Sequence, residues 1–218
     1  MTSRRAFLAG GATGLVALTS GCLGFVMGDP LEFDAGAVRP TDAALEDSGY
    51  EEQDADWERI EETVEFGVER EIRASIWTAV YNKEVSIQGV GREAAVFAAV
   101  SLPAMEVLGR TLNPLDDMDN EEVLEELRGE IEGEYGTLRD ISHDETIDVP
   151  ILGDQRTVEV YTAKTDLEGQ EIEIMLVLTV FDHEDDLLVL LGSHPRLLPD
   201  EGVTIEELME SVEHPLEG

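Results

Sequence analysis

The sequence predicts an α+β fold in which amphipathic helices pack against one twisted antiparallel β-sheet, forming an α-β-α sandwich. Two patterns indicate this class. Several segments have the apolar periodicity of strands, and some are apolar on both faces, as expected for strands that are covered above and below. Two others carry apolar residues at helical spacing behind capping signals. Because the sequence contains no internal repeat, we expect one domain over residues 31–218.

The first expected elements are short. Residues 31–33 are expected to form a short edge strand. Thr41 is a good N-cap, Asp42 suits a first helical turn and Gly49 is a natural stop, so a short helix is expected between them. The very acidic residues 51–59 are expected to be an exposed strand or a loop.

Two long strands are expected in the next part of the chain. Residues 72–81 alternate, and both faces of this strand should be covered in its second half. Gly89 and Gly91 mark a plain turn, because a phosphate-binding loop would need a third glycine and a following helix. Residues 94–100 are apolar on both faces, which predicts a central strand.

A second helix is expected to begin after Asp119. Asp119 and Glu122 have the spacing of a capping box, and Met118 can pack against Val123. The apolar stripe of this helix consists of Val123, Leu124, Leu127 and Ile131, and its outer face carries solvated glutamates. The acidic stretch that follows, through His143, is expected to be a loose connection.

The second half of the chain predicts an antiparallel meander. Gly153 and Asp154 mark a tight hairpin, Gly169 marks another turn and residues 182–186 a third. The strands joined by these turns are expected at residues 149–152, 157–161, 172–181 and 187–191. The longest of them alternates between two apolar faces, so we expect cover on both sides of the sheet there.

The last helix is expected to begin at Thr204. Thr204 and Glu207 have the spacing of a capping box, and Val203 before them can pack against Leu208. Its apolar face is expected to consist of Ile205, Leu208, Met209 and Val212. Pro215 should close the helix.

The first 22 residues predict export. Arg4 and Arg5 form the charged region of a twin-arginine signal, which an apolar run over residues 6–21 follows. This run is shorter than the ~20 residues that a spanning helix needs. It ends in small residues before Cys22, the arrangement that a lipoprotein signal peptidase requires before the thiol takes a lipid. Thr19 occupies the place where a branched apolar residue is usual.

Cys22 is the only cysteine, so the chain has neither a disulfide framework nor a spare thiolate for catalysis. We expect residues 1–21 to be a cleaved signal peptide, Cys22 to be lipidated and residues 22–30 to be a short tether. A tether of this length keeps the domain within about 30 Å of the lipid. The alternative is an uncleaved anchor in which Cys22 is merely a small buried residue.

The chain is strongly acidic. Its formal net charge is −36 over 218 residues, and only two of its 14 basic residues are lysines, Lys83 and Lys164. The acidic residues are spread along the whole chain, which favours adaptation to high salt, where a Debye length of about 3 Å at 1 M screens their repulsion. The alternative is an acidic interaction surface. Such a charge excludes nucleic acid as a partner, because phosphate contacts need clustered Lys and Arg.

The sequence offers no convincing catalytic or metal site. The best metal candidate is residues 182–186, whose oxygen ligands suit Ca²⁺ or Mg²⁺, but the spacing of a calcium loop is absent and an exposed turn is favoured; the same holds for residues 143–145. His194 is expected to end a strand, and His214 to lie at a helix C-terminus, where a cation is favoured. Nucleophile, phosphate-loop and zinc-protease motifs are absent, so we assign no catalytic, metal or cofactor-binding residue.

Six segments together carry a resemblance to a family. They are residues Ser3–Arg5, Ser20–Cys22, Asp29–Phe33, Gly49–Glu51, Val107–Pro114 and Asn120–Glu122. On these segments the chain resembles uncharacterised haloarchaeal lipoproteins with twin-arginine signals, a family defined by a domain of unknown function. The resemblance implies export and anchoring and supplies no catalytic residue. The expected order of strands and helices also resembles the PsbP-like arrangement, which is an analogy of architecture alone.

These features predict an exported protein of a halophile, held by a lipid on the outer face of the cell membrane. We expect it to bind or scaffold an unidentified protein or small ligand without catalysis. The alternative is a carrier of a small apolar ligand or lipid in a pocket between sheet and helices. Trp77 and Tyr81 could line such a pocket, although residues of this kind more often form a core beneath a helix.

Overall fold

The computed structural model describes residues 30–65, 69–87, 89–107, 110–111, 115, 118–120, 122–125, 137–167 and 170–216. Arg4, Arg5 and Cys22 lie outside these residues, so export and lipidation stay predictions. The chain divides into two compact units, which are described separately. One contains residues 1–32 and 60–73, and the other contains residues 33–59 and 74–218.

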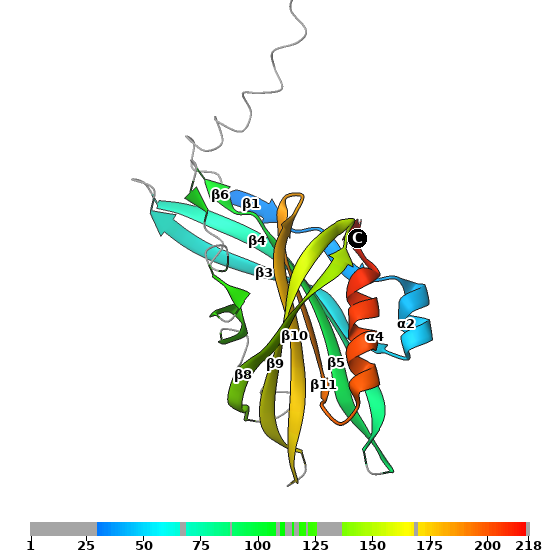
Figure 1. Ribbon diagram of the computed structural model, residues 1–218. Helices are drawn as coiled ribbons and strands as arrows, with labels where there is room; N and C mark the ends of the chain where they lie inside the picture. Colours follow the sequence, from blue (N-terminus) through cyan, green and yellow to red (C-terminus); the bar gives the residue numbers. More distant parts are fainter. Residues whose placement is uncertain are drawn as a thin grey trace, which may run out of the picture. The chain divides into compact units, whose positions relative to one another are not determined.

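Strands dominate the described part of the chain (Figure 1). Helix α2 spans Asp42–Ser48 and helix α4 spans Pro199–Glu210, and residues 122–125 are also helical. The strands are β1 Leu31–Asp34, β2 Ala37–Pro40, β3 Glu51–Glu65, β4 Glu69–Ile87, β5 Val90–Pro103, β6 Glu106–Val107, β7 Arg110–Thr111, β8 Arg139–Ile151, β9 Asp154–Leu167, β10 Gln170–His183, β11 Asp186–Pro195 and β12 Val212–Leu216.

The largest sheet has eight strands. Six of them follow the order β4-β5-β11-β10-β9-β8, while β1 and β3 each pair with β4. The pairs β4–β5, β5–β11, β10–β11, β9–β10 and β8–β9 are all antiparallel. The predicted meander in the second half of the chain is therefore confirmed. So is the central strand, because β5 lies between β4 and β11.

The predicted α-β-α sandwich is wrong. Of the residues that the structure describes, 70% lie in strands and 16% in helices, and the helices found among them are short. Two acidic stretches account for much of the difference. Residues 139–143, expected as part of a loose connection, belong to β8, and residues 51–65, of which 51–59 were expected as an exposed strand or a loop, form the long exposed strand β3. Because carboxylates occupy both faces of these strands, the period-two pattern is hidden, and the ladder hydrogen bonds stabilise the strands instead.

In the first unit, Arg73 is surrounded by three carboxylates. Its guanidinium lies 2.6 Å from Glu71, 3.4 Å from Glu61 and 3.6 Å from Glu32. The hydrogen bond and the charge of Glu71 raise the pKa of Arg73, and the two more distant carboxylates add to this effect. One arginine thus offsets part of the repulsion within an acidic group of strands.

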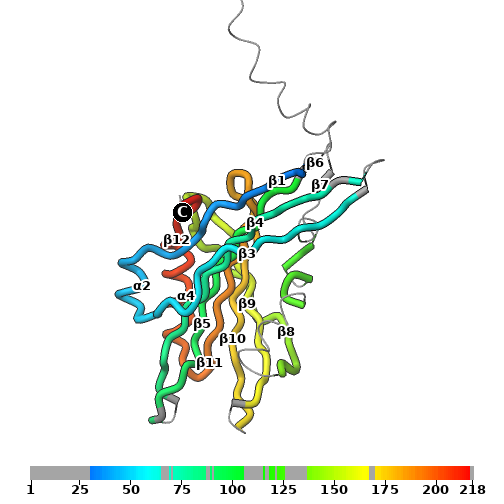
Figure 2. Tube along the Cα trace, turned by 180° about the vertical axis from the view of Figure 1, so that it is seen from behind, coloured from blue at the N-terminus to red at the C-terminus, as the bar shows by residue number. Residues whose placement is uncertain are grey.

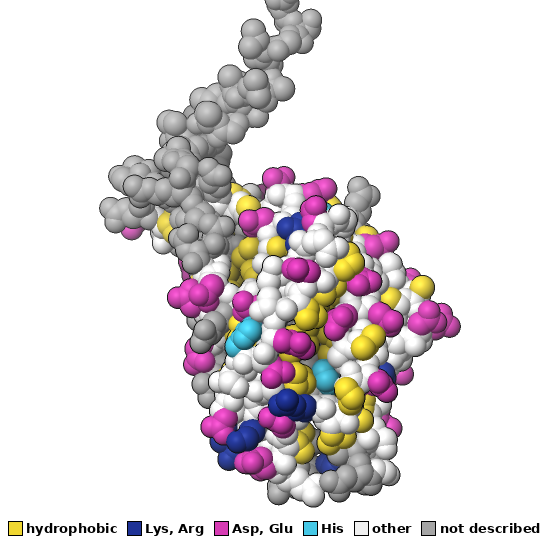
Figure 3. All heavy atoms as spheres, viewed as in Figure 1, with side chains coloured by type: hydrophobic (Ala, Val, Ile, Leu, Met, Phe, Trp, Pro, Cys, Tyr) yellow, Lys and Arg dark blue, Asp and Glu magenta, His cyan; other side chains and the backbone are white. Residues whose placement is uncertain are grey.

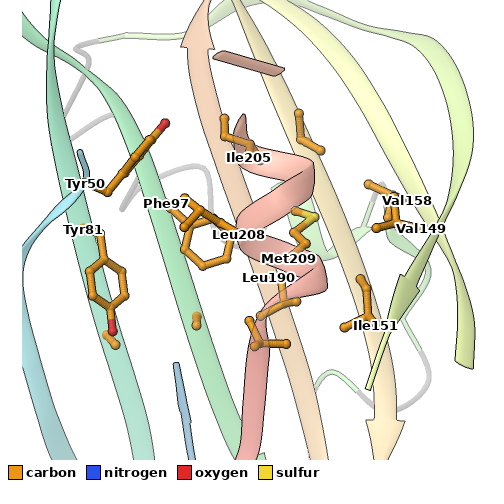
Figure 4. Close-up of a cluster of buried hydrophobic side chains, with 14 of the residues drawn as sticks. Tyr50, Tyr81, Phe97, Val149, Ile151, Val158, Leu190, Ile205, Leu208 and Met209 are labelled. Atoms are coloured by element: carbon orange, nitrogen blue, oxygen red, sulfur yellow. The ribbon is translucent and has the colours of Figure 1, made fainter. Parts of the chain in front are cut away.

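In the second unit, two separate clusters of buried apolar side chains cover the two faces of the sheet. One face packs under α4 and is called the α4 face; its strand residues include Ala79, Tyr81, Ala95, Phe97, Ala99, Val177 and Leu190. Figure 4 shows Ile205, Leu208 and Met209 of α4 pointing into this cluster. The other face is called the aliphatic face; its buried residues include Leu102, Tyr161, Ile174, Leu176, Leu178, Leu187 and Val189.

The cover of the aliphatic face begins with the predicted capping box. The Asp119 N–H donates to Glu122 Oε2 at 3.1 Å, and the Glu122 N–H donates to Asp119 Oδ1 at 3.0 Å. Helical residues 122–125 follow, and Val123 and Leu124 are buried in the cluster of this face. The capping signals are therefore confirmed, whereas the predicted stripe residues Leu127 and Ile131 lie outside the described residues.

Helix α2 forms as predicted. The Thr41 hydroxyl accepts a hydrogen bond from the Ala44 N–H at 3.3 Å, and Gly49 ends the helix with a φ of 74°, a conformation that glycine adopts without strain. Ala44 and Leu45 pack against the α4 face cluster. Figure 2 shows α2 beside α4 and β12 beside β2, which tie the two ends of this unit together.

Helix α4 begins earlier than predicted. It starts at Pro199 rather than Thr204, because proline suits the first helical turn and needs no donor there. Thr204 lies inside the helix, and its hydroxyl donates to the Asp200 carbonyl. The expected apolar face is correct for Ile205, Leu208 and Met209, but Val212 belongs to β12.

Candidate functional site

Four polar side chains meet where β12 closes over the sheet, and we call them the His214 cluster: Ser101, His183, Asp186 and His214. Ser101 lies near the end of β5, His183 is the last residue of β10 and Asp186 is the first residue of β11. His214 comes from β12, which pairs with β2. The β10–β11 hairpin pairs His183 with Asp186, and β5 lies beside β11, so three adjacent strands bring these residues together.

Asp186 is the centre of the hydrogen bonds in this cluster. Its Oδ2 accepts a hydrogen bond from the Gly36 N–H at 2.6 Å and lies 2.9 Å from His214 Nε2. The Ser101 hydroxyl donates to the same oxygen at 3.3 Å. The other ring nitrogen of His214, Nδ1, lies 2.9 Å from Nδ1 of His183, and the two rings meet at an interplanar angle of 68°.

The His214 cluster is buried except at one end. Ser101, Asp186 and His214 are buried, whereas His183 is partly exposed. A buried carboxylate is costly unless hydrogen bonds replace its water, and the three donors around Asp186 supply that replacement. Gly36 is required here because a Cβ at this position would lie 2.4 Å from Pro215 Cβ and 3.0 Å from His214 Nε2.

The arrangement differs from that of a serine nucleophile. In a Ser-His-Asp triad the serine and the carboxylate occupy opposite ring nitrogens of the histidine. Here Ser101 Oγ, at 3.4 Å, and Asp186 both approach Nε2 of His214. Ser101 is also fully buried, so its hydroxyl cannot reach a substrate.

The residues of the predicted metal candidate 182–186 do not lie together in one site. His183 and Asp186 turn inward into the His214 cluster, while Asp182, Glu184 and Asp185 are exposed. Among the described residues, no group of three or more His, Cys, Asp or Glu side chains is arranged to hold a metal ion. Residues 143–145 lie on β8. There the His143 ring forms a hydrogen bond with the Thr146 hydroxyl and makes an edge-to-face contact with the Tyr161 ring.

The predictions for the two remaining histidines, His194 and His214, have different outcomes. His194 lies at the end of β11, as predicted, and burial lowers its pKa. The prediction for His214 is wrong: α4 ends at Glu210, and His214 lies four residues further on in β12, with its ring buried against Asp186. A buried carboxylate, rather than the helix terminus, is therefore the electrostatic partner of His214.

Trp77 and Tyr81 belong to the packing of the α4 face. The Trp77 indole N–H donates to the Val38 carbonyl at 2.8 Å, and its ring lies 5.0 Å from that of Trp57. Tyr81 is fully buried 6.3 Å from Phe97, and burial, with a smaller contribution from Glu52, raises the pKa of Tyr81 to about 12. This matches the reading of these residues as core beneath a helix.

The surface that the structure describes is acidic, and both lysines are engaged by carboxylates. Acidic side chains are spread over the face shown in Figure 3, with few Lys and Arg among them. Lys83 lies 2.8 Å and 2.9 Å from the two carboxylate oxygens of Glu201 on α4. Lys164 lies 2.8 Å from Asp140, and this contact raises the pKa of Lys164 and lowers that of Asp140.

Ser101 was missed by the sequence reasoning, as was the pairing of Asp186 with His214. Two weak signals were present. Ser101 is a polar residue that directly follows the apolar segment 94–100, and Asp186 immediately precedes the apolar segment 187–191. A polar residue at the end of a buried strand needs a partner, but the sequence does not say from which segment that partner comes.

The fold and the cluster define a mostly-β protein with a large mixed sheet and a buried polar network at one end. The chain belongs to the family described as domain of unknown function (DUF6517), whose model matches residues 37–213. No curated protein sequence matches the chain significantly. A crystal structure of PA94, a protein of unknown function from Pseudomonas aeruginosa, is similar over 72% of this chain and 99% of that chain, with 12% identity and a TM-score of 0.36. No helix among the described residues is long and apolar enough to cross a membrane.

Proposed function

We propose that this protein is a lipid-anchored module on the outer face of a halophile's cell membrane, where it binds or scaffolds a partner without catalysing a reaction. The observation that carries the proposal is the order of features in the first 22 residues. Two arginines, an apolar run, small residues and the only cysteine of the chain follow one another with the spacing of an exported lipoprotein.

The negative net charge of the chain supports the proposal that the protein works at high salt concentration. Cleavage before Cys22 would remove Arg4 and Arg5 and no acidic residue, so the mature chain would carry a net charge of −38. At low salt, with a Debye length of about 10 Å at 0.1 M, carboxylates such as those along β3 repel one another strongly. We therefore expect the free energy of unfolding to rise as NaCl increases from 0.1 M to 2 M.

The surroundings of Ser101 and the exposure of Trp57 support a binding role rather than a catalytic one. The sequence has no nucleophile motif, and Ser101, whose hydroxyl lies 3.4 Å from His214, is buried with that hydroxyl directed to Asp186. Trp57 leaves 38% of its surface exposed while its ring contacts Trp77, and exposed aromatic side chains of this kind are common in contact surfaces. The partner is a protein or small ligand, and the negative charge disfavours nucleic acid.

The anchoring is tested by the variant Cys22→Ser, expressed in a haloarchaeal host and compared with Met27→Ser, a serine substitution in the tether that leaves the thiol intact. The wild type and Met27→Ser should fractionate with membranes, and mass spectrometry should show a lipid on Cys22. Cys22→Ser should lose the lipid and leave the membrane fraction. Membrane retention of Cys22→Ser after export would contradict the proposal.

Export is tested separately by replacing Arg4 and Arg5 together with lysines. This variant should remain inside the cell with residues 1–21 uncleaved, because the twin arginines are the recognised address. Extraction of the purified wild type with organic solvent, followed by mass spectrometry, examines the alternative role. A stoichiometric apolar ligand would favour a carrier over a scaffold.

A further inference from the structure

We propose that His183 and His214 form a two-imidazole site for a divalent transition-metal ion, with Cu²⁺ and Ni²⁺ fitting better than Zn²⁺. Their Nδ1 atoms lie 2.9 Å apart, on strands β10 and β12. Imidazole nitrogen suits these ions, whereas Ca²⁺ and Mg²⁺ require oxygen ligands. The proposal is independent of the lipid anchor, because all its residues lie in the second unit.

His214 is already oriented for this role by Asp186. The carboxylate oxygen 2.9 Å from Nε2 accepts the ring N–H, so Nδ1 carries the lone pair that faces His183. Metal-binding histidines usually donate their second N–H to a carboxylate in this way, and that contact fixes the ring and makes it a better ligand. Gly36 and Ser101 hold the carboxylate itself in place.

The separation of the two nitrogens decides which ions fit. With metal–nitrogen bonds of about 2.0–2.1 Å, two ligands at a right angle lie about 2.9 Å apart, and two at a tetrahedral angle lie about 3.3–3.4 Å apart. The observed 2.9 Å is the hydrogen-bonded contact of the two rings without an ion, and a right-angle site keeps this separation while His183 turns. Right angles between neighbouring ligands are typical of Cu²⁺ and Ni²⁺, whereas Zn²⁺ prefers a tetrahedron, for which the rings would have to separate.

His183 is the ring that adjusts when the ion binds. It is partly exposed at the end of β10, next to the turn formed by Glu184 and Asp185. The terminal torsion of a histidine has a broad energy minimum, so this ring can turn from its contact with His214 toward a shared ion at low cost. Without the ion, one Nδ1–H of the pair donates to the other nitrogen, so neither polar atom is left unsatisfied.

Two protein ligands make an open site. Water fills the remaining coordination positions, which agrees with the absence of any group of three or more ligating side chains among the described residues. The exposed carboxylates of Asp182, Glu184 and Asp185 lie beside His183 in the chain and raise the local concentration of cations. We therefore expect an exchangeable ion rather than one that the fold needs for stability.

The test uses the full chain in detergent with Cys22→Ser in every sample, so that a free thiol cannot bind the ion. Cu²⁺ is titrated in 1 M NaCl with an excess of Mg²⁺, which screens and occupies carboxylate sites. Electron paramagnetic resonance at one equivalent of Cu²⁺ should show two imidazole nitrogens. The affinity order should be Cu²⁺ above Ni²⁺ above Zn²⁺.

The critical variant is His183→Gln, whose amide can keep a hydrogen bond to His214 but supplies no second imidazole. It should lower the Cu²⁺ affinity at least tenfold and leave a one-nitrogen spectrum, with unchanged circular dichroism. The control His143→Gln removes a histidine from β8 and should change neither the affinity nor the spectrum. Equal binding by His183→Gln and the wild type, or a wild-type spectrum without two nitrogens, would overturn the proposal.

Discussion

The α4 face and the aliphatic face of the sheet are covered in different ways. On the α4 face, a 12-residue helix packs against β11, where Gly192 leaves room for Ile205, and the same face carries large strand residues such as Tyr81 and Phe97. On the aliphatic face, the sheet presents branched side chains, Leu176 and Leu178 among them, to a cover that includes the helical turn 122–125. Where Gly192 leaves room, the helix can approach the sheet closely, whereas the branched side chains of the other face fill the volume next to the sheet.

Both faces are built by the same strands, because successive side chains of a strand point to opposite sides. In β10, Leu176 enters the aliphatic face and Val177 the α4 face. The comparison therefore predicts that opposite kinds of substitution destabilise the two faces. The aliphatic face should be damaged most by the loss of volume, and the α4 face by its addition.

The largest effect is expected from Leu176→Ala on the aliphatic face. Leu176 is fully buried, so the variant should leave a cavity and lower the free energy of unfolding by about 2–5 kcal/mol. Denaturant unfolding of the full chain in high salt measures this change. Val203→Ala, at a position on α4 that is 55% exposed, is the control and should stay within about 0.5 kcal/mol of the wild type. A loss below about 1 kcal/mol for Leu176→Ala would mean that this face is not tightly filled.

Next in size is Gly192→Ala on the α4 face. The added Cβ would lie 2.3 Å from Cγ2 of Ile205, so α4 must shift, and overpacking of this kind costs about 1–3 kcal/mol. The same substitution in an Ile205→Ala background should cost much less, because the opposing methyl group is gone. A double-mutant cycle measures this coupling, and additive costs would show that the helix does not rest on Gly192.

The cover of the aliphatic face is tested by Asp119→Ala. This variant removes the acceptor for the Glu122 N–H and should cost about 1 kcal/mol. Glu122→Gln is the matched control, since glutamine can keep the second half of the capping box. Equal losses in thermal or denaturant unfolding for the two variants would point to a general charge effect rather than to the cap.

The smallest effect at neutral pH is expected from Tyr81→Phe on the α4 face. The Tyr81 hydroxyl is buried without a hydrogen-bond partner among the described residues, so its loss should change stability by less than about 1 kcal/mol. At alkaline pH the difference should grow. Burial raises the folded-state pKa of Tyr81 to about 12, whereas an unfolded tyrosine titrates near ~10.

The sign of this pH dependence follows from the two pKa values. Above pH 10 the unfolded chain loses the Tyr81 proton while the folded chain keeps it, so the wild type should lose stability from pH 10 until about pH 12. Tyr81→Phe should lack this part of the loss, as unfolding midpoints measured at several pH values would show. Parallel curves for the two proteins would mean that Tyr81 ionises without cost in the folded state.

The sequence predicted those elements whose signals are local. Helix α2 is set by Thr41 and Gly49, and β5 and β10 are long apolar segments that hardly allow another structure. The fold class was missed because exposed acidic strands lack the alternation that identifies a strand. In β8, register shifts between Arg139 and Ser142 and between His143 and Glu145 disturb the pattern further.

The His214 cluster could not be predicted for a different reason. Its residues come from β5, the β10–β11 hairpin and β12, and only the hairpin pair is local in sequence. The position of His214 also depended on where α4 ends: Pro215 was expected to close the helix, whereas α4 ends at Glu210 and residues 212–216 form β12. Residues from distant strands meet only because of the order of the strands in the sheet, and hydrophobic periodicity does not encode that order.

The pairing of β2 with β12 has a consequence for biosynthesis. Pro40 pairs with Val212, so one of the first strands of this unit waits for one of the last. Residues through Val212 must be synthesised before the pair can form, and such distant closure is slow compared with local folding. This unit is therefore expected to mature only after β12 has emerged, and truncation before β12 should leave β2 without its partner and Asp186 without its imidazole.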